Sequence, residues 1–481
     1  MLSVQETDPF PPCPEPVNLA GYVMNAGLAC PNKTALRIVS HEATQEWSYA
    51  ELRQAVLGTA TGFLQHGARP GSKILMRLGN TVDFPIVYLA ALAAGCVPVP
   101  TSAALTEVEV DKIVQSLRPD VIVRDPTVPC PEVADTIPLY TLRKFWQLPT
   151  SEIHMGSLDR LGYIVYTSGT SGQPRAVGHA HRAIWARRMM FDGWYGLTNN
   201  DRVMHAGAFN WTYTLGTGLM DPWTVGATAL IPAAGTTPAE LGSLMNRHGA
   251  TIFAAAPGIF RQMLAQTSRL DAPELRHGLS AGEKLTAATA LAWTEVTGKP
   301  VYEAYGMSEC STFISHGPDT KGPPETLGCP QRGRRVALLE NGVPVERGQE
   351  GTIAIHRSDP GLMLEYIGAP DETSDRFCAD WFMTGDRGSM DADGFITYFG
   401  RNDDMMNPGG FRVSPIEVED VLIGMPGVDS VAVTEVTVKE GTSVIAAFYT
   451  GPTPLDETAW HDYVTKSLAR YKQPRMFIHQ V

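Results

Sequence analysis

The chain has 481 residues and a net charge of −13, with 38 Lys and Arg residues against 51 Asp and Glu residues. At roughly 100 to 200 residues per domain, this length predicts more than one domain. Hydrophobic residues make up 43% and charged residues 19%, which is typical of folded globular proteins and excludes collagen-like, disordered and disulfide-scaffold classes. The acidic balance argues against nucleic acid or an anionic lipid surface as a partner.

The seven cysteines lie far apart, and none is part of a C-x-x-C pair of the kind found in zinc sites and redox motifs. We expect them to be reduced and mostly buried. The first residues, MLSVQETDPFPPCPEP, are acidic and proline-rich, whereas a signal peptide has a basic start and an apolar run. The sequence therefore predicts a cytoplasmic protein.

Helix-like and strand-like patterns alternate along the chain, which predicts an α/β fold with parallel strands. Residues 49–67 have apolar side chains at helical spacing, and residues 73–79 form a strand-like run. The apolar stretch 84–100 is shorter than the ~20 residues that cross a bilayer, so it predicts a buried helix followed by a strand. Further strand-like runs are DVIVRD, LGYIVYTS, ATALIPA and ATIFAAAP.

The pattern changes in the last third of the chain. Residues 329–400 are typical of glycine-rich strands, which predicts a β-rich sub-structure. Residues 414–450 are typical of a helix and two strands, and DETAWHDYVTKSLARY is typical of a second helix. We therefore expect a large N-terminal domain, residues 1–402, made of α/β sub-domains and the β-rich sub-structure, and a small α+β C-terminal domain, residues 403–481.

The strongest local motif is YTSGTSGQPR, residues 166–175, which we call the hydroxyl-rich loop. Its glycines allow the backbone to approach a phosphate, its hydroxyl side chains can donate hydrogen bonds, and Arg175 supplies a positive charge. The motif favours a polyphosphate ligand, although the same residues can form a turn without any ligand. The signatures of P-loop NTPases, dinucleotide-binding folds and α/β-hydrolases do not occur, which argues against those classes.

Three further segments follow in order: YEAYGMSEC (302–310), WFMTGDRG (381–388) and GRNDDMMNPGGFRVSPIEVE (400–419). With the hydroxyl-rich loop, they make the sequence similar to the AMP-forming adenylating enzymes from about residue 18 onward. This superfamily comprises acyl-CoA synthetases, peptide-synthetase adenylation domains and firefly luciferase. The resemblance implies that ATP and a carboxylic acid form an acyl-AMP and pyrophosphate, and that a thiol then takes the acyl group.

The resemblance also implies a nucleotide site. The hydroxyl-rich loop would hold the β- and γ-phosphates, with Arg175 in place of the usual lysine, and a guanidinium keeps the positive charge. Tyr305 would stack on adenine, Ser308 would meet the α-phosphate, and Glu309 would bind Mg²⁺, which prefers oxygen ligands. The implied nucleotide-binding residues are Thr167, Ser168, Gly169, Thr170, Ser171, Gly172, Arg175, Gly282, Glu283, Lys284, Tyr305, Asp386 and Arg401.

Two of these assignments rest on looser matches. Residues 280–284 resemble the loop that contacts adenine through its backbone, and Asp386 resembles the carboxylate that holds both ribose hydroxyls, with Arg401 beside it. Other interpretations stay open: a surface carboxylate at Glu309, a core aromatic at Tyr305 and a turn cap at Asp386.

The implied chemistry needs positioning and charge neutralisation. A carboxylic acid with a pKa of ~4 is already ionised at neutral pH, so the first step needs no general base. Mg²⁺ at Glu309, Arg412 and a mobile lysine would stabilise the charge that builds up on pyrophosphate. The thiol then attacks an activated acyl group, so no protein nucleophile is required. The implied catalytic residues are Thr167, Ser308, Glu309 and Arg412.

In the family, the small C-terminal domain rotates between the two half-reactions. Asp403 occupies the hinge position, and Gly409 and Gly410 would line the channel for the pantetheine arm of CoA, with a plain loop as the alternative. The family lysine lies in a segment like P-x-T-x-x-G-K, which the 481 residues do not contain, and Lys472 precedes its expected place. Without that lysine, adenylation would fall by roughly 10² to 10³, and thioester formation would suffer less.

The acyl pocket of the family is formed partly by the segment that corresponds to residues 205–218, whose pattern is most similar to benzoate-CoA ligases. This segment lacks the Asp that holds the ammonium group in amino-acid adenylation domains, which argues against an amino acid. Gly306 stands where acetyl-CoA synthetases have a Trp, so the acid is expected to be larger than acetate. Asn210 would face a ring hydroxyl, with core packing as the alternative for the pocket residues. The implied pocket residues are Phe209, Asn210, Trp211, Tyr213, Ala281, Gly306 and Met307.

The leading hypothesis is an acid-CoA ligase for an aryl or medium acyl acid that uses ATP, Mg²⁺ and CoA. The alternatives are an enzyme that loads the acyl group onto the phosphopantetheine arm of a carrier protein, a luciferase-type oxidase, and a non-catalytic protein that binds nucleotide and acid. Neither nucleic acid nor a membrane is expected as a partner, and a homodimer stays open.

Overall fold

The computed structural model describes residues 1–42, 44–132, 135–167, 175–267, 269–320, 322–323, 325–402, 406, 413–439, 442–468 and 470–480. The chain forms two compact units. The larger unit comprises Glu6–Arg335 and Arg357–Arg376, and the smaller unit comprises Met1–Gln5, Val336–His356 and Phe377–Val481. The expected boundary between residues 402 and 403 borders residues that are not described, so the predicted domain division stays a prediction.

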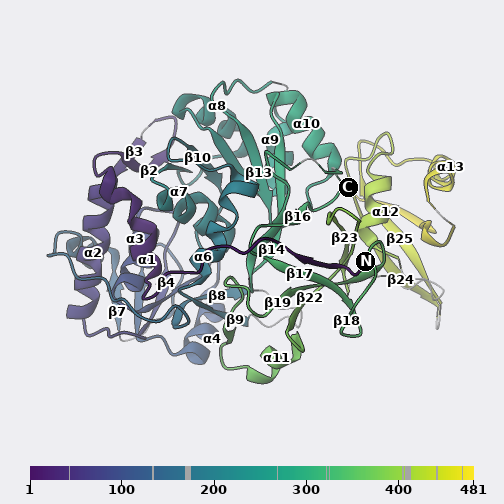
Figure 1. The fold of residues 1–481 in the computed structure, drawn as a ribbon. Coiled ribbons are helices and arrows are strands. Elements are labelled where there is room, and N and C mark those ends of the chain that lie inside the picture. Colours follow the sequence, from purple (N-terminus) through teal and green to yellow (C-terminus); the bar gives the residue numbers. More distant parts are fainter. Residues whose placement is uncertain are drawn as a thin grey trace. The chain divides into compact units, whose positions relative to one another are not determined.

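In the described part of the larger unit, the main element is a nine-stranded sheet (Figure 1). Its inner strands, from β14 to β2, are parallel, and its edge strands are antiparallel. The predicted α/β fold with parallel strands is therefore confirmed. The strands in spatial order are β16 (Cys329–Pro330), β15 (Ser311–Ser315), β14 (Val301–Met307), β13 (His277–Ala281), β12 (Ile252–Ala255), β10 (Arg202–Ala206), β11 (Thr228–Pro232), β2 (Thr34–Val39) and β3 (Thr44–Ser48).

Helices cover both faces of this sheet because alternate residues of its strands point to opposite sides. Met204 and Phe253 pack on one face with α8, α9 and α10, and their neighbours Val203 and Ile252 pack on the other face with η2 and with Tyr213 at the start of η3. Strands buried on both faces are nearly continuous apolar runs, as in ATIFAAAP. These helices are α8 (Pro238–His248), α9 (Pro257–Leu264), α10 (Ala287–Thr297) and the π-helices η2 (Phe191–Tyr195) and η3 (Thr214–Met220).

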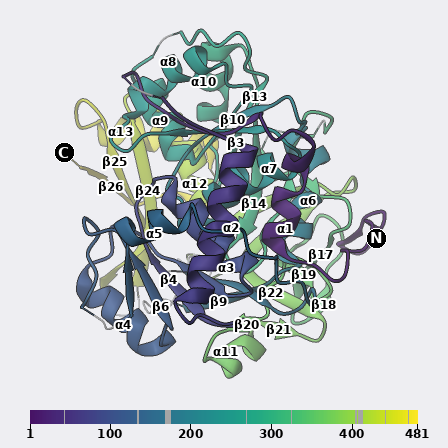
Figure 2. The same ribbon diagram turned by 90° about the vertical axis from the view of Figure 1, so that its left-hand side faces the viewer.

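A four-stranded parallel sheet lies in the N-terminal part of the larger unit, and α2 and α3 lie side by side near it (Figure 2). The capping box of Ser48 and Glu51 starts α2. The predicted buried helix and strand of residues 84–100 are α3 and β5. The sheet consists of β5 (Val97–Pro100), β4 (Lys73–Arg77), β6 (Val121–Arg124) and β7 (Thr136–Pro138), and its helices are α2 (Tyr49–Gln65), α3 (Asp83–Ala93), α4 (Glu107–Leu117) and α5 (Leu139–Phe145). The remaining short helices are α1 (Leu19–Met24), η1 (Ala26–Ala29), α6 (Ala183–Arg188) and α7 (Asp221–Thr224).

The hydroxyl-rich loop connects two strands of a small antiparallel sheet. LGYIVYTS forms β8 (Leu161–Thr167), which pairs with β9 (Arg175–Ala180), and β9 pairs in turn with β20 (Glu365–Tyr366). The expectation of a parallel strand was wrong for β8, because the seven residues between β8 and β9 are too few for the crossover that parallel strands require. Those seven residues, 168–174, lie outside the described residues.

The smaller unit contains the predicted β-rich sub-structure and the predicted helix, strand, strand and helix of the C-terminal part. Its larger sheet consists of β1 (Val4–Glu6), β17 (Arg335–Glu340), β18 (Val343–Pro344), β19 (Glu350–His356), β21 (Phe377–Cys378), β22 (Trp381–Met390) and β23 (Ile396–Arg401). The C-terminal part consists of α12 (Pro415–Leu422), β24 (Ser430–Lys439), β25 (Thr442–Thr450), α13 (Glu457–Ser467), η5 (Arg470–Lys472) and β26 (Met476–His479). Val418, Ile445 and Trp460 are in its core.

All seven cysteines are free, as expected. Cys96, Cys130 and Cys310 are buried, whereas the other four are partly exposed, so burial is less complete than the sequence predicts. Within the described ranges, no helix has the length and apolar character needed to cross a membrane.

Candidate active site

The loop after β13, which was expected to contact adenine, is held by a buried carboxylate. Glu303 on β14 accepts a hydrogen bond from the backbone N–H of Leu285 at 2.7 Å. Gly282 has a φ of +99°, and a Cβ there would lie 2.4 Å from the Trp211 ring, so this position requires glycine. The side chain of Glu283 is exposed, and Lys284 donates to the carbonyl of Glu325 at 3.0 Å. These contacts hold the backbone of the loop in place.

The YGMSE motif lies at the end of β14 and in the turn that leads to β15. The register between these strands shifts at Tyr305 and Gly306. A Cβ at Gly306 would lie 2.3 Å from the carbonyl oxygen of Ser311, so backbone atoms fill the space where a side chain would start. The Tyr305 ring is partly exposed and contacts Phe313 edge-on, with ring centres 5.3 Å apart.

His179 on β9 supports Ser308, a relationship that the sequence did not reveal. Its Nε2 lies 2.8 Å from the carbonyl oxygen of Ser308 and donates to it. Burial lowers the pKa of His179 to about 4, so the ring is neutral at pH 7, and it stacks on Tyr163 at 4.8 Å. The backbone of Ser308 is thus fixed by a side chain from a different sheet.

A buried ion pair supports the other end of the same turn. Arg187 on α6 contacts Asp221 at 2.5 Å and donates to the hydroxyl of Ser311 at 2.7 Å. Ser311 has a φ of +62°, which is unusual for a residue other than glycine. Arg187 and Asp221 are both buried, and among the described residues their charges are compensated by one another and by the hydroxyl groups of Tyr195, Thr217 and Ser311.

Glu309 is the carboxylate that was expected to bind Mg²⁺. Its Oε1 accepts a hydrogen bond from the hydroxyl of Tyr366 at 2.7 Å, and its backbone carbonyl accepts one from Met363 N–H at 2.7 Å. Burial, followed by the charge of Glu309, raises the pKa of Tyr366, so its hydroxyl stays a donor. Among the described residues, Oε2 of Glu309 has no hydrogen-bond partner, so one oxygen is left for a cation.

This donor set fits Mg²⁺ that is bound together with a nucleotide. The part of the chain that the structure describes contains no cluster of three or more His, Cys, Asp or Glu residues that could hold a metal ion alone. Mg²⁺ is commonly held by one or two carboxylates together with phosphate oxygens and water. A single buried carboxylate such as Glu309 matches that arrangement.

The two described ends of the hydroxyl-rich loop lie opposite each other. Thr167 pairs with Arg175 in the β8–β9 hairpin. Arg175 forms an ion pair with Glu372, and its guanidinium lies 5.4 Å from the centre of the Tyr366 ring. The predicted site residues Ser168, Gly169, Thr170, Ser171 and Gly172 lie outside the described residues.

The expected ribose residues are in the smaller unit. Asp386 on β22 pairs with Arg401 on β23, and their side chains approach to 3.6 Å. The hydroxyl of Tyr398 donates to Asp386 at 3.5 Å, and the Asp386 side chain is nearly buried. Asp403, Gly409, Gly410 and Arg412 lie outside the described residues, so their roles stay predictions.

The expected acyl-pocket residues differ in their exposure. Phe209 is buried against Phe84, and Tyr213 is buried and donates to the Leu279 carbonyl at 2.9 Å. Asn210, Trp211 and Met307 are partly exposed, and Ala281 belongs to the same core cluster as Tyr213. The structure thus brings Trp211, Tyr213, Ala281 and Gly282 together.

Asn80 fixes the loop of Phe209, a contact that no sequence motif indicated. Its amide donates to the carbonyl of Gly207 at 2.8 Å, and its carbonyl accepts from the N–H of Phe209 at 2.9 Å.

A pocket of about 30 Å³ is lined by Tyr163, His179 and Ser308, among other residues. That volume is enough for one or two water molecules and is too small for an aromatic ring.

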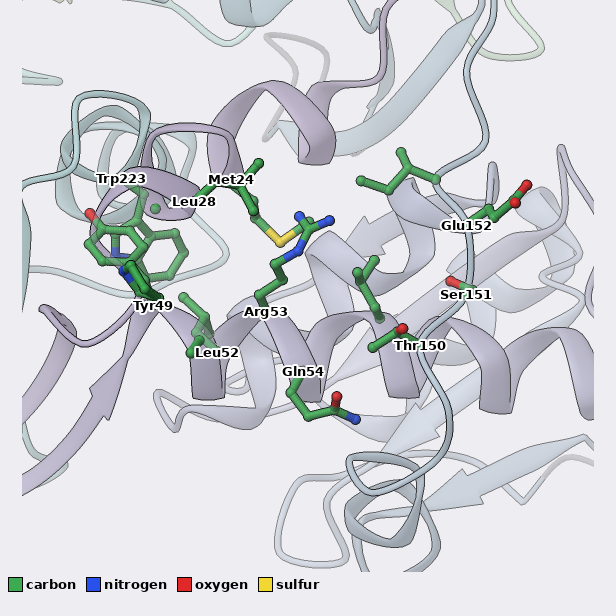
Figure 3. Close-up of a pocket in the computed structure, with 15 residues that line it drawn as sticks. Met24, Leu28, Tyr49, Leu52, Arg53, Gln54, Thr150, Ser151, Glu152 and Trp223 are labelled. Carbon is green, nitrogen blue, oxygen red and sulfur yellow. The ribbon is translucent and has the colours of Figure 1, made fainter.

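A much larger groove, about 600 Å³, lies beside α2 (Figure 3). Met24, Leu28, Tyr49, Arg53 and Glu152 are among the residues that line it. Its lining includes none of the predicted site residues, so the size of a pocket does not identify the candidate site here.

The sequence model of a family described as "AMP-binding enzyme" matches residues 25–367. The chain therefore belongs to the AMP-binding enzyme family, as the resemblance of its motifs implied.

Relatives of known name agree with this family. A 3-hydroxybenzoate–CoA/4-hydroxybenzoate–CoA ligase of Thauera aromatica is 27% identical over 476 residues, which is 90% of this chain and 88% of that protein. The mouse mitochondrial acyl-coenzyme A synthetase ACSM3 is 27% identical over 89% of this chain and 80% of its own length. The crystal structure of the anthranilate CoA ligase AuaEII with anthranoyl-AMP has a TM-score of 0.88 and 25% identity, and the match covers 97% of this chain and 94% of that one.

Proposed function

We propose that the protein is an AMP-forming acid-CoA ligase for an aromatic carboxylic acid. The observation that supports this most is the turn after β14, where Ser308 and Glu309 are adjacent and each is fixed from outside the turn, by His179 and Tyr366 respectively. A hydroxyl and a carboxylate held in this way suit a phosphate and its cation.

In the first half-reaction, a carboxylate oxygen of the acid attacks the α-phosphorus of ATP. The new O–P bond forms as the bond between the α-phosphorus and the bridging oxygen breaks, and pyrophosphate leaves with the electron pair. Ser308 would donate to the α-phosphate, and Arg175 would neutralise charge on the leaving phosphates. A divalent cation at Glu309 would supply further charge neutralisation.

In the second half-reaction, the thiol of CoA loses its proton to the solvent and attacks the acyl carbon. The C–S bond forms, the bond between the acyl carbon and the phosphate oxygen breaks, and AMP leaves. Because the acyl group is already activated, the protein mainly orients the two reactants.

Two features support an aromatic acid. Trp211 and Tyr213 contact each other edge-on at 5.5 Å, beside Ala281 and Gly282, and residues 205–218 contain no Asp or Glu to bind an ammonium group. The hydroxybenzoate ligase and the anthranilate ligase, both named for aromatic acids, are similar to this chain over nine-tenths or more of its length.

The test is AMP formation with ATP, Mg²⁺ and a panel of benzoate, hydroxybenzoates, anthranilate, butyrate and octanoate, each with and without CoA. We expect AMP to form with an aromatic acid and CoA. A second assay supplies synthetic benzoyl-AMP and CoA and follows benzoyl-CoA, so that the thioester step is measured apart from adenylation.

Glu309→Gln tests the assigned carboxylate, and Glu295→Gln, an exposed carboxylate on α10, is its matched control. We expect adenylation to fall in Glu309→Gln and to stay unchanged in Glu295→Gln. AMP formation with butyrate or octanoate but with none of the aromatic acids would contradict the proposal of an aromatic substrate. ATP binding without either half-reaction, across the panel, would contradict the ligase.

A further inference from the structure

Residues Arg357–Arg376, which we call the strap, belong to the larger unit although the segments before and after them belong to the smaller one. The strap is firmly anchored. Asp359 forms a buried ion pair with Arg334 at 2.5 Å, and Arg182 donates to the carbonyl of Pro360 at 2.6 Å. Its strand β20 pairs with β9 beside the short helix α11 (Pro370–Asp375), as Figure 2 shows.

The strap contacts Glu309 through both its backbone and a side chain. Met363 N–H donates to the carbonyl of Glu309, and the hydroxyl of Tyr366 donates to Oε1 of its side chain, each at 2.7 Å. Tyr366 is 4% exposed and Glu309 is 9% exposed, so water competes little for this bond. The backbone of Tyr366 is fixed in turn, because its N–H donates to the Thr373 hydroxyl at 2.9 Å.

A buried carboxylate with one oxygen bound has less freedom to rotate. Hydrogen bonds from outside a metal site orient the ligands, and their loss typically lowers metal affinity about 10- to 100-fold. With Oε1 bound to Tyr366, Oε2 of Glu309 is the oxygen left for a cation. The Tyr366 ring also lies 5.4 Å from the guanidinium of Arg175, so one side chain contacts both the carboxylate and the cation assigned to the phosphates.

We propose that Tyr366 is a positioning residue that holds Glu309 in the orientation required to bind a divalent cation together with ATP. This inference rests on the proposed function, because the cation is the one that ATP brings to the site. The hydroxyl sets how much Mg²⁺ is needed for tight nucleotide binding.

The test is ATP binding by calorimetry, measured in EDTA and at increasing Mg²⁺, for the wild-type protein and for Tyr366→Phe. We expect the Mg²⁺ concentration at half effect to rise by about 10- to 100-fold in Tyr366→Phe, with little change in EDTA. Tyr49→Phe is the matched control, because Tyr49 is also buried and donates to a carbonyl, that of Ala227, at 2.5 Å.

A double mutant separates positioning from general packing. If Tyr366 acts through Glu309, Tyr366→Phe has no further effect on the Mg²⁺ dependence in a Glu309→Gln background. Equal Mg²⁺ dependence of Tyr366→Phe and wild type overturns the inference and leaves the proposed function intact. Wild-type ATP binding that does not respond to Mg²⁺ also overturns the inference, because Glu309 would then have no cation to hold. The proposed function is overturned separately, by the absence of AMP formation.

A second variant covers the case in which Tyr366→Phe does not fold. With 3-fluorotyrosine at position 366, the hydroxyl is kept, and we expect its ¹⁹F resonance to shift when Mg²⁺ is added to the ATP complex. The same addition to the Glu309→Gln protein should leave the resonance unchanged. An unchanged resonance in both proteins would overturn the inference.

Discussion

Arg175, at the end of the hydroxyl-rich loop, forms an ion pair with Glu372 in helix α11 of the strap. The Glu372 carboxylate therefore pairs with the same Arg175 guanidinium that we assign to the phosphates of ATP. An exposed or half-exposed pair of this kind has a small net energy, because both charges are partly solvated. Glu372 therefore competes with the phosphates of ATP for Arg175, and the energy of this competition is small.

We expect Glu372→Gln to bind ATP about 1.4- to 5-fold more tightly than wild type, since an exposed ion pair contributes about 0.2–1 kcal/mol. Calorimetry at low and at high ionic strength measures this, and the gain should shrink in salt. Glu365→Gln, which changes an exposed carboxylate on β20, is the control. Weaker ATP binding by Glu372→Gln would mean that Glu372 orients Arg175 instead.

Removal of the Glu303 side chain should weaken the binding of ATP more than the binding of the acid. In Glu303→Ala, the Leu285 N–H loses an acceptor that is buried and charged, which costs about 1.5–3 kcal/mol. A loss of this size corresponds to a rise of about 10-fold or more in the KM for ATP, and we expect the KM for the acid to change less. Glu303→Gln keeps an acceptor oxygen and should recover most of the loss. Equal changes in both KM values would argue that the loop after β13 does not contact the nucleotide.

Gly306→Ala should destabilise the protein and lower its activity. The new Cβ would lie 2.3 Å from a backbone oxygen, so the β14–β15 turn has to move, which we expect to cost about 1–3 kcal/mol. Thermal unfolding and AMP formation report the two effects. Gly258→Ala in α9 is the matched control, because its Cβ would lie no closer than 3.7 Å to the neighbouring atoms considered. Its helical position predicts unchanged or slightly raised stability.

The stability of the protein should fall as the pH drops below about 6.5. His205 is fully buried, and neither ring nitrogen has a hydrogen-bond partner among the described residues. Burial lowers its pKa from 6.5 to about 3, so between these values the unfolded chain binds a proton that the folded protein does not. The stabilisation is complete above pH 6.5 and is lost as the pH falls toward 3.

One such histidine changes the free energy of unfolding by about 1.4 kcal/mol per pH unit within that window. We expect His205→Met to reduce the slope of unfolding free energy against pH by up to about 1.4 kcal/mol per pH unit, the equivalent of one proton. His461→Met, at an exposed position on α13, should leave the slope unchanged. Denaturant unfolding at a series of pH values measures both slopes, and equal slopes in all three proteins would contradict this account.

Local pattern was sufficient to predict the α/β class and a number of its helices and strands. Continuous apolar runs predicted parallel strands such as β11 and β12 and the buried helix α3, and helical spacing predicted α2, because burial on all sides or on one stripe leaves a direct trace in the sequence. The antiparallel hairpin of β8 and β9 was missed because an apolar run does not specify the direction of its partner. The motifs singled out Tyr305, Ser308 and Glu309, and the structure places them at the end of β14 and in the turn that follows.

The supporting residues could not be predicted in the same way. Tyr366 is 57 residues from Glu309, and Asn80 is 129 residues from Phe209. His179 and Glu303 likewise act through single hydrogen bonds to distant or non-adjacent backbone groups. A contact of this kind leaves no periodicity and no motif, because only the folded chain brings its partners together.

Strand β1 has a consequence for synthesis on the ribosome. It pairs with β17, although the two strands are far apart in the sequence: β1 ends at Glu6 and β17 begins at Arg335. Roughly 330 residues are translated in between, which takes about 16 to 66 s at about 5–20 residues per second. During that time β1 lacks its partner β17, whereas the parallel sheets of the larger unit can already form. Residues 4–6 are therefore synthesised long before the strand that holds them in place.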